Sequence, residues 1–172
     1  MYGIWNTEAG KNSSAAFEGL YSGNYAFNQT PVKCFDQNIT TKYLSYGSCW
    51  DSLSPAANCG LKTGFYITPI RGLSILRTVR FVTSEDYPQR DPLLITIECS
   101  NQTATTSLNF GSNWILIYNG SSGLDTDPGR NSYGVKKNIS KNVWCRSYRL
   151  LVASKRANSN SVQYSEVEFI GH

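Results

Sequence analysis

The chain of 172 residues has one histidine, one methionine and little charge: Asp, Glu, Lys and Arg make up 16% of it, with a net charge of +4. The histidine is the terminal His172, so no plausible Ser–His or Cys–His pair is available for nucleophilic catalysis. No Gly-rich phosphate-binding loop opens a helix. The mild basic excess also lacks the dense stripe of Lys and Arg typical of nucleic-acid-binding proteins. These absences argue against an enzyme and against a nucleic-acid partner.

Long periodic and apolar segments are also missing. No stretch of ten or more residues keeps the 3.6-residue period of an amphipathic helix. No apolar run approaches the roughly 18 residues of a membrane span, so we expect no membrane partner of that kind. The chain opens without the charged and apolar segments of a secretion signal, and we expect any such signal to have been removed or left out ahead of Met1.

Cysteine usage favours disulfides over a metal site. The five cysteines form no CxxC pair, and a zinc site is not expected with a single histidine. In an extracellular setting, Cys49 and Cys59 are placed to staple the loop between them, and Cys99 and Cys145 to pair across two sheets. Cys34 is left over, either as a small buried thiol or as half of an intermolecular bridge.

Six Asn-x-Ser/Thr sequons favour a secreted chain. Pro31 directly follows the sequon of Asn28 and disfavours it, and Asn38 would be a poor acceptor if its side chain bound an ion. The remaining candidates for glycosylation are Asn12, Asn101, Asn119 and Asn138.

Short segments that alternate hydrophobic and polar residues recur along the chain. The predicted strands are residues 63–69, 74–83, 93–99, 114–118, 147–153 and 162–170, with turn signals such as Asn119-Gly120 between them. Many short strands separated by turns predict an all-β fold, a jelly-roll β-sandwich. We assign residues 31–172 to this sandwich, and residues 1–30 either to its first strands or to an arm that wraps around it.

An oxygen-rich stretch lies at residues 35–44, FDQNITTKYL. A hard cation such as Ca²⁺ takes several oxygen ligands at about 2.3–2.6 Å, and a tight polar turn can supply most of them. Such a turn does not easily supply a second carboxylate, for which the remote Ser165-Glu166 is the candidate. The alternative is an Asx-turn that enters a strand and holds no ion.

The stretch from Asn28 to Leu44 resembles the P-x-x-A-x-D-G-N-x-x-T-x-W/Y signature of galactose-binding-like domains, and residues 164–170, YSEVEFI, resemble their closing S/A-E-[ILV]-E strand. This superfamily includes discoidin (coagulation-factor C-type) domains, carbohydrate-binding modules and fucolectin-like lectins. The resemblance covers roughly residues 28–171 and implies a β-sandwich with a structural Ca²⁺. The implied ligands are Asp36, Asn38, Thr41, Ser165 and Glu166.

One departure from this signature concerns Gln37, which stands where the superfamily usually has Gly. Glycine adopts the left-handed backbone conformation at little cost, whereas other residues do so rarely. We therefore expect the turn at Gln37 to avoid that conformation.

Residues 83–92, TSEDYPQRDP, carry more polar groups than a turn requires. An aromatic ring can stack on the C–H face of a pyranose, while carboxylate and guanidinium groups bind hydroxyls in pairs. The placement is similar to the arginine-bearing loop of fucolectins, but Ser84 replaces the first arginine and no upstream His exists, so fucose specificity is not implied. The candidate ligand-binding residues are Tyr87, Arg90, Asp91 and Asp86, with Trp50 of the stapled loop as an aromatic platform.

Ion pairing is the alternative interpretation of these charges. Arg90 and Asp91 can latch their loop to Asp127 and Arg130. Basic residues of the last third form either a solvated face or a site for an anionic partner; they are Lys136, Lys137, Lys141, Arg146, Arg149, Lys155 and Arg156.

The sequence therefore predicts an extracellular carbohydrate-binding domain, lectin- or adhesin-like, with a structural Ca²⁺ and glycans as partners. We expect weak single-site affinity, near the millimolar range or about −4 kcal/mol. The alternatives are a self-associating structural subunit of an extracellular filament or matrix, and a discoidin-like membrane- or protein-binding module.

Overall fold

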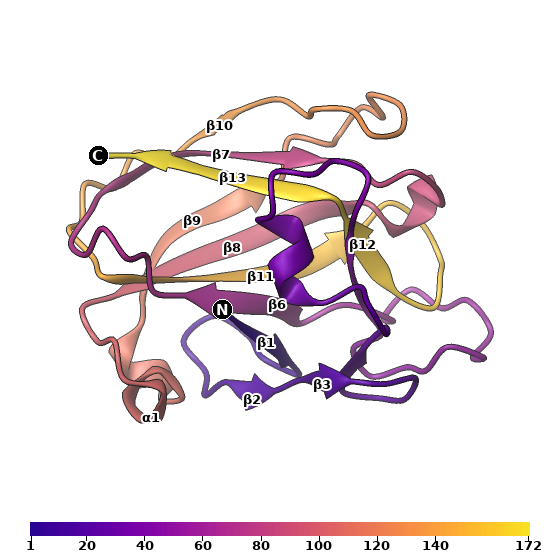
Figure 1. The fold of residues 1–172 in the computed structure, drawn as a ribbon, viewed down its shortest axis with the longest axis horizontal. Helices are drawn as coiled ribbons and strands as arrows, with labels where there is room; N and C mark the ends of the chain where they lie inside the picture. The colour runs from indigo at the N-terminus through magenta and orange to yellow at the C-terminus, as the bar shows by residue number, and fades with distance from the viewer.

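The alternating segments of the chain pair into two layers that face each other, as the computed structural model of residues 1–172 shows (Figure 1). One layer is a six-stranded antiparallel sheet. Its strands, in spatial order, are β2 (Ser14–Ala15), β1 (Tyr2–Trp5), β6 (Thr63–Ile67), β11 (Ser147–Lys155), β8 (Pro92–Ser100) and β9 (Ile115–Ser121). The first residues of the chain therefore supply strands of the sandwich, because β1 pairs with β6.

The opposite layer consists of two smaller sheets. The first has the order β10 (Lys137–Asn138), β7 (Leu76–Val82) and β13 (Glu166–Gly171). The second has the order β12 (Val162–Tyr164), β5 (Tyr43–Ser45), β4 (Asn24–Tyr25) and β3 (Phe17–Glu18). Helical structure is limited to single turns: η1 (Pro31–Cys34), η2 (Pro88–Arg90), α1 (Thr105–Leu108) and η3 (Gly111–Asn113). The prediction of an all-β sandwich is confirmed.

The hydrophobic core lies between the layers. Alternation along β8 turns Ile95 and Ile97 inward, and both are fully buried. From the opposite layer, Tyr164 packs edge-to-face against Phe81 and Tyr43, with ring centroids 5.2 and 5.6 Å apart. Edge-to-face geometry is favourable for aromatic rings because a positive ring edge meets a negative face.

Two predicted strand limits are wrong. Asn119-Gly120 is not a turn, because β9 continues to Ser121 and pairs Asn119 with Thr96. The segment 162–170 is not one strand: it divides at Ser165 into β12, which pairs with β5, and β13, which pairs with β7. In both places long-range pairing outweighs the local sequence signal.

The outer face of the six-stranded sheet carries a buried ion pair. The Arg149 Nε lies 2.7 Å from a Glu98 carboxylate oxygen, and both side chains are almost fully buried. The segment before β2 covers the pair, since the Gly10 N–H donates to Glu98 at 2.7 Å and Arg149 donates to the Lys11 carbonyl at 2.9 Å. The basic residues of the last third therefore do not form a single solvated face.

The cysteines pair as expected, Cys49 with Cys59 and Cys99 with Cys145. Cys34 is free and fully buried, and its thiol contacts the Pro31 carbonyl at 3.0 Å. Burial also raises the pKa of this thiol well above its usual value. A buried, protonated thiol rules out the intermolecular bridge in this conformation. None of the helices is long and apolar enough to cross a membrane.

Candidate functional site

The turn after η1 and the start of β13 meet, although they lie at opposite ends of the sequence (Figure 1). Within the turn, the Asp36 carboxylate accepts hydrogen bonds from the Asn38 N–H at 3.0 Å and from the Thr41 hydroxyl at 2.9 Å. Gln37 has φ +62°, so the expectation that it would avoid the left-handed conformation is wrong. The tight turn is kept without Gly, at the modest cost that a non-glycine residue incurs in this region.

Glu166 completes the arrangement from β13. One of its carboxylate oxygens accepts a hydrogen bond from the same Asn38 N–H at 3.1 Å. Burial, and next the adjacent carboxyl group of Asp36, raise the pKa of Glu166 to about 7. Two neighbouring carboxyl groups ionise together only at an energetic cost, so the pair either keeps a proton or needs a cation between the two carboxylates.

These residues fit a hard cation in part. Asp36 accepts from Thr41, and Asp36 and Glu166 both accept from the Asn38 N–H, so these are the two carboxylates that would hold an ion. The Asn38 side chain instead accepts a hydrogen bond from the Thr40 hydroxyl at 2.7 Å, so Asn38 takes part through its backbone. Ser165 has a buried hydroxyl with no hydrogen-bond partner. No third acidic, His or Cys side chain joins the pair.

A second group of candidates lies on the loops at one end of the sandwich. Loop 83–91, between β7 and β8, places the Arg90 guanidinium over the Tyr87 ring, 4.1 Å from its centroid. The backbone of Tyr87 has φ +45°, and the residue is 50% exposed. Arg90 donates through Nη1 to Gln163 at 3.2 Å and through Nη2 to Asn160 at 3.0 Å. We call Tyr87, Arg90, Asn160 and Gln163 the apical cluster.

Asp86 lies beside this cluster. Its carboxylate accepts hydrogen bonds from the Lys42 ammonium at 2.7 Å and from the Gln163 amide at 2.8 Å. Lys42 also pairs with Glu85 at 3.3 Å. Asp86 and Glu85 therefore share one lysine as their cationic partner.

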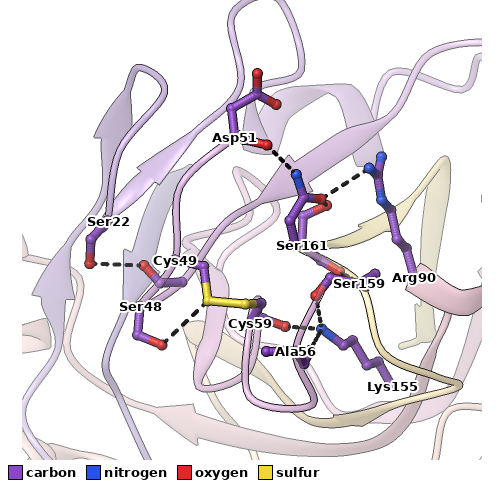
Figure 2. Close-up of a disulfide and its surroundings, with 12 residues drawn as sticks. Ser22, Ser48, Cys49, Asp51, Ala56, Cys59, Arg90, Lys155, Ser159 and Ser161 are labelled. Carbon is purple, nitrogen blue, oxygen red and sulfur yellow. Dashed lines mark hydrogen bonds between the residues drawn. A yellow bond between two sulfur atoms is a disulfide. The ribbon is translucent and has the colours of Figure 1, made fainter. Parts of the chain in front are cut away.

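Trp50 lies in the stapled loop and is 42% exposed. Figure 2 shows how the loop is held: the Lys155 ammonium, below the disulfide, donates to the carbonyls of Ala56, Cys59 and Ser159. The Asn160 side chain donates to the Asp51 carbonyl at 2.6 Å while it accepts from Arg90. This contact joins the Trp50 loop to the apical cluster.

Asp91, in contrast, is not exposed beside the apical cluster. It is fully buried, and its two oxygens accept from the two Nη atoms of Arg130 at 2.9 and 2.7 Å. Arg156 lies 3.4 Å from the same carboxylate. Asp91 therefore anchors the loop, as the ion-pair alternative predicts, and cannot reach a ligand in solvent. Arg90 does not share this role, because Arg130, not Arg90, pairs with Asp127.

Asn160, Gln163 and Asp51 were not among the predicted site residues. Asn160 lies on the connection from β11 to β12, and Gln163 is the middle residue of β12. The polar run at 158–161 was only a weak indication of a binding site, because such runs are common in turns. The four glycosylation candidates, Asn12, Asn101, Asn119 and Asn138, are all exposed.

Comparison with solved structures shows which known folds the chain resembles. A family 32 carbohydrate-binding module of a family 31 glycoside hydrolase from Clostridium perfringens superposes with a TM-score of 0.62 at 14% identity, over 90% of each chain. The C-terminal domain of a chitobiase from Bacteroides fragilis gives 0.56 at 16% identity, over 86% of this chain and 84% of that one. A family 32 module from C. perfringens in complex with galactose gives 0.55 at 8% identity, over 83% and 85%.

These similarities define the chain as a β-sandwich of the galactose-binding-like fold. No protein-family model and no curated protein matches the sequence. At such low identities the superposition establishes the fold alone, so any ligand must be argued from the residues of this chain.

Proposed function

We propose that the protein is an extracellular carbohydrate-binding module that binds sugar hydroxyls at the apical cluster, through Arg90 and Asn160. Gln163 is fully buried, so its part is to hold Arg90 in place. The observation that carries this proposal is Arg90, whose guanidinium lies over the half-exposed Tyr87 ring and donates to two side-chain amides. Solved proteins of the same fold support it: one was determined with galactose, one with GalNAc-β-1,3-galactose, and one is a chitosan-binding module.

The chemistry of the cluster suits a sugar. The exposed part of the Tyr87 ring offers an apolar surface for the C–H face of a pyranose, and Trp50, next to the Asp51 that Asn160 contacts, is also exposed. Arg90 and Asn160 offer donors and acceptors in a fixed arrangement, because each is already held by a protein partner. Each hydroxyl exchanges water for protein with little net gain, so single-site affinity is expected near the millimolar range.

We further propose a structural Ca²⁺ between Asp36 and Glu166. Support comes from the adjacency of the two carboxyl groups and from the raised pKa of Glu166, since a divalent cation relieves the repulsion between them. The bound ion would fix the turn after η1 against β13. Backbone carbonyls and water would complete its oxygen shell.

An extracellular setting is part of the proposal. The two disulfides favour an oxidising compartment, and the exposed sequons are accessible to glycosylation. Binding rather than catalysis is proposed, because Asp86 and Glu85 pair with Lys42, and Asp127 pairs with Arg130.

A glycan array tests the proposal, with the protein displayed in multiple copies and read with Ca²⁺ and with EDTA. Binding to a defined set of glycans is expected. EDTA should weaken it only as far as it destabilises the fold, because the ion is assigned no contact with the sugar. A folded protein that binds no glycan in either condition would contradict the carbohydrate-binding proposal.

Self-association remains a second candidate, because exposed aromatic residues gather in the N-terminal segment. Phe17, Tyr21 and Phe27 are all more than half exposed. Large exposed apolar groups often mark interaction sites. Light scattering at increasing protein concentration tests this role, with a triple serine variant of these residues as the control. Because Cys34 is buried, reductant should not change the result.

A further inference from the structure

A groove of about 670 Å³ lies on the outer face of the sheet formed by β7 and β13. Its floor includes Arg80 from β7 and Glu168 from β13, which are directly paired across the strands. Gln37 and Ile39 line it from the turn after η1, and Tyr133 from the segment before β10. None of the apical cluster residues lines this groove. Its volume falls in the range of small-molecule sites.

The ion pair on the floor leaves two groups free. Arg80 contacts Glu168 through Nε at 2.8 Å and through Nη2 at 2.7 Å, and both contacts go to the same oxygen, Oε2. Nη1 of Arg80 and Oε1 of Glu168 therefore have no protein partner. The pair is also partly exposed, with side-chain exposures of 26% and 32%. A charged donor and a charged acceptor are thus fixed close together and accessible from the groove.

The walls add uncommitted polar groups to an apolar surface. The Gln37 amide, the Tyr133 hydroxyl and the Lys136 ammonium make no side-chain hydrogen bond or ion pair, although all three line the groove. The Tyr133 ring is 48% exposed, and Arg80 holds it from one side, 4.1 Å from its centroid. Apolar lining comes from residues that include Ile39 and Ile170.

We propose that this groove is a second saccharide-binding site, for an uncharged sugar with neighbouring hydroxyl groups. One hydroxyl donates to Oε1 of Glu168, and the adjacent hydroxyl accepts from Nη1 of Arg80. Charge-assisted hydrogen bonds of this kind are the strong ones, and the pair presents both in a fixed geometry. The exposed part of the Tyr133 ring covers a C–H face of the sugar.

A neutral sugar fits the charges of the groove better than an acidic one. Arg80 and Glu168 neutralise each other, and the remaining charged lining residues, Lys136 and Glu166, have opposite signs. A carboxylated sugar would approach the Glu168 carboxylate with a like charge. The inference rests on the proposed function for its ligand class, and it places a second contact on a different face. Two weak sites on one chain would raise the avidity for a polysaccharide.

The experiment is an NMR titration of ¹⁵N-labelled protein with galactose, lactose and chitotriose, each raised to about ten times a millimolar dissociation constant. We expect at least one of these sugars to shift the amide resonances of Gln37, Glu168 and Ile170. In the double variant Arg80→Gln/Glu168→Gln, two neutral amides replace the charged pair. The shifts should then require at least about tenfold more sugar. Tyr133→Ala, on the exposed wall, should weaken the same shifts if the double variant fails to fold.

Tyr87→Ala separates this inference from the proposed function, because it should remove shifts at the apex and leave those of the groove. Shifts at the apex alone would overturn the groove and keep the proposed site. Shifts at the groove alone would keep the groove and overturn the apical site. No shift at either place with any of the three sugars would overturn both.

Discussion

Glu166 accepts a hydrogen bond from the backbone N–H of Asn38 at 3.1 Å, across 128 positions of the sequence. The contact joins the turn after η1 to the last strand. The Asp36 carboxyl group shares the same N–H, so the two acids lie together at a place where the sandwich closes.

This arrangement predicts how stability depends on pH. Without metal, the pKa of Glu166 is raised from 4.5 to about 7, so the folded state binds the proton more tightly than the unfolded state. Its favourable contribution is present below about pH 4.5 and is lost as the pH rises through about 7. Urea unfolding of EDTA-treated protein should show this decline. The Glu166→Gln variant should lack it, and an equally steep decline in that variant would contradict the assignment.

Calcium should reverse the trend. Because the ion needs deprotonated carboxylates, it should raise the melting temperature more at about pH 8 than at about pH 5. Differential scanning calorimetry with Ca²⁺ and with EDTA measures this difference. The proposal of a structural Ca²⁺ would be wrong if neither Asp36→Asn nor Glu166→Gln reduced the effect.

The buried pair of Arg149 and Glu98 predicts a large loss of stability on truncation. In Glu98→Ala the Arg149 charge stays buried without its partner, and breaking such a pair costs about 3–5 kcal/mol. Urea unfolding measures the loss. Glu8→Ala is the matched control, because its ion pair with Lys62 is about half exposed, is screened by solvent and should contribute far less to stability. Similar values for the two variants would contradict a buried pair.

The contacts of Lys155 predict that replacing it causes a local loss of order in the stapled loop. In Lys155→Met three carbonyls, two of them in buried hydrogen bonds, lose their donor, which should destabilise the protein by at least about 2 kcal/mol. Hydrogen exchange should quicken for residues 50–58 before it does in β8 and β11. The exposed Lys11→Met serves as the control. Unchanged exchange in the loop would show that the ammonium does not hold it.

The thiols give a chemical test of the covalent framework. Under native conditions no thiol should react with a thiol reagent, because Cys34 is fully buried and the other four cysteines are paired. One thiol per chain should react after denaturation without reductant. Three or more reactive thiols would contradict the disulfide assignment.

Much of the fold could be predicted from sequence. The alternation that buries Ile95 and Ile97 is local, and so is the oxygen-rich turn at Asp36. The pairing of Asp36 with Glu166 came from a resemblance at both ends of the chain, since spacing alone cannot bring together residues so far apart. The left-handed Gln37 was missed because intrinsic preference disfavours it, while the surrounding contacts impose it.

The apical cluster was less predictable, because it depends on how separate loops meet. Arg90 and Asp91 are adjacent in sequence, yet one lies beside the exposed Tyr87 ring and the other is buried against Arg130. Their composition is equally suitable for sugar binding. The two roles differ only because the two side chains leave the end of η2 in different directions. Their partners, residue 130 for Asp91 and residues 160–163 for Arg90, set these directions.

The most direct test of the apical site is calorimetric titration of the Arg90→Ala variant with the glycan that the wild-type protein binds best on an array. We predict that its affinity falls by at least about tenfold, because a guanidinium donor and the order of Asn160 are lost together. Ile70→Ser, an exposed substitution remote from the apex, should bind as the wild type does. An Arg90→Ala protein that remains folded and binds with wild-type affinity would contradict the apical site.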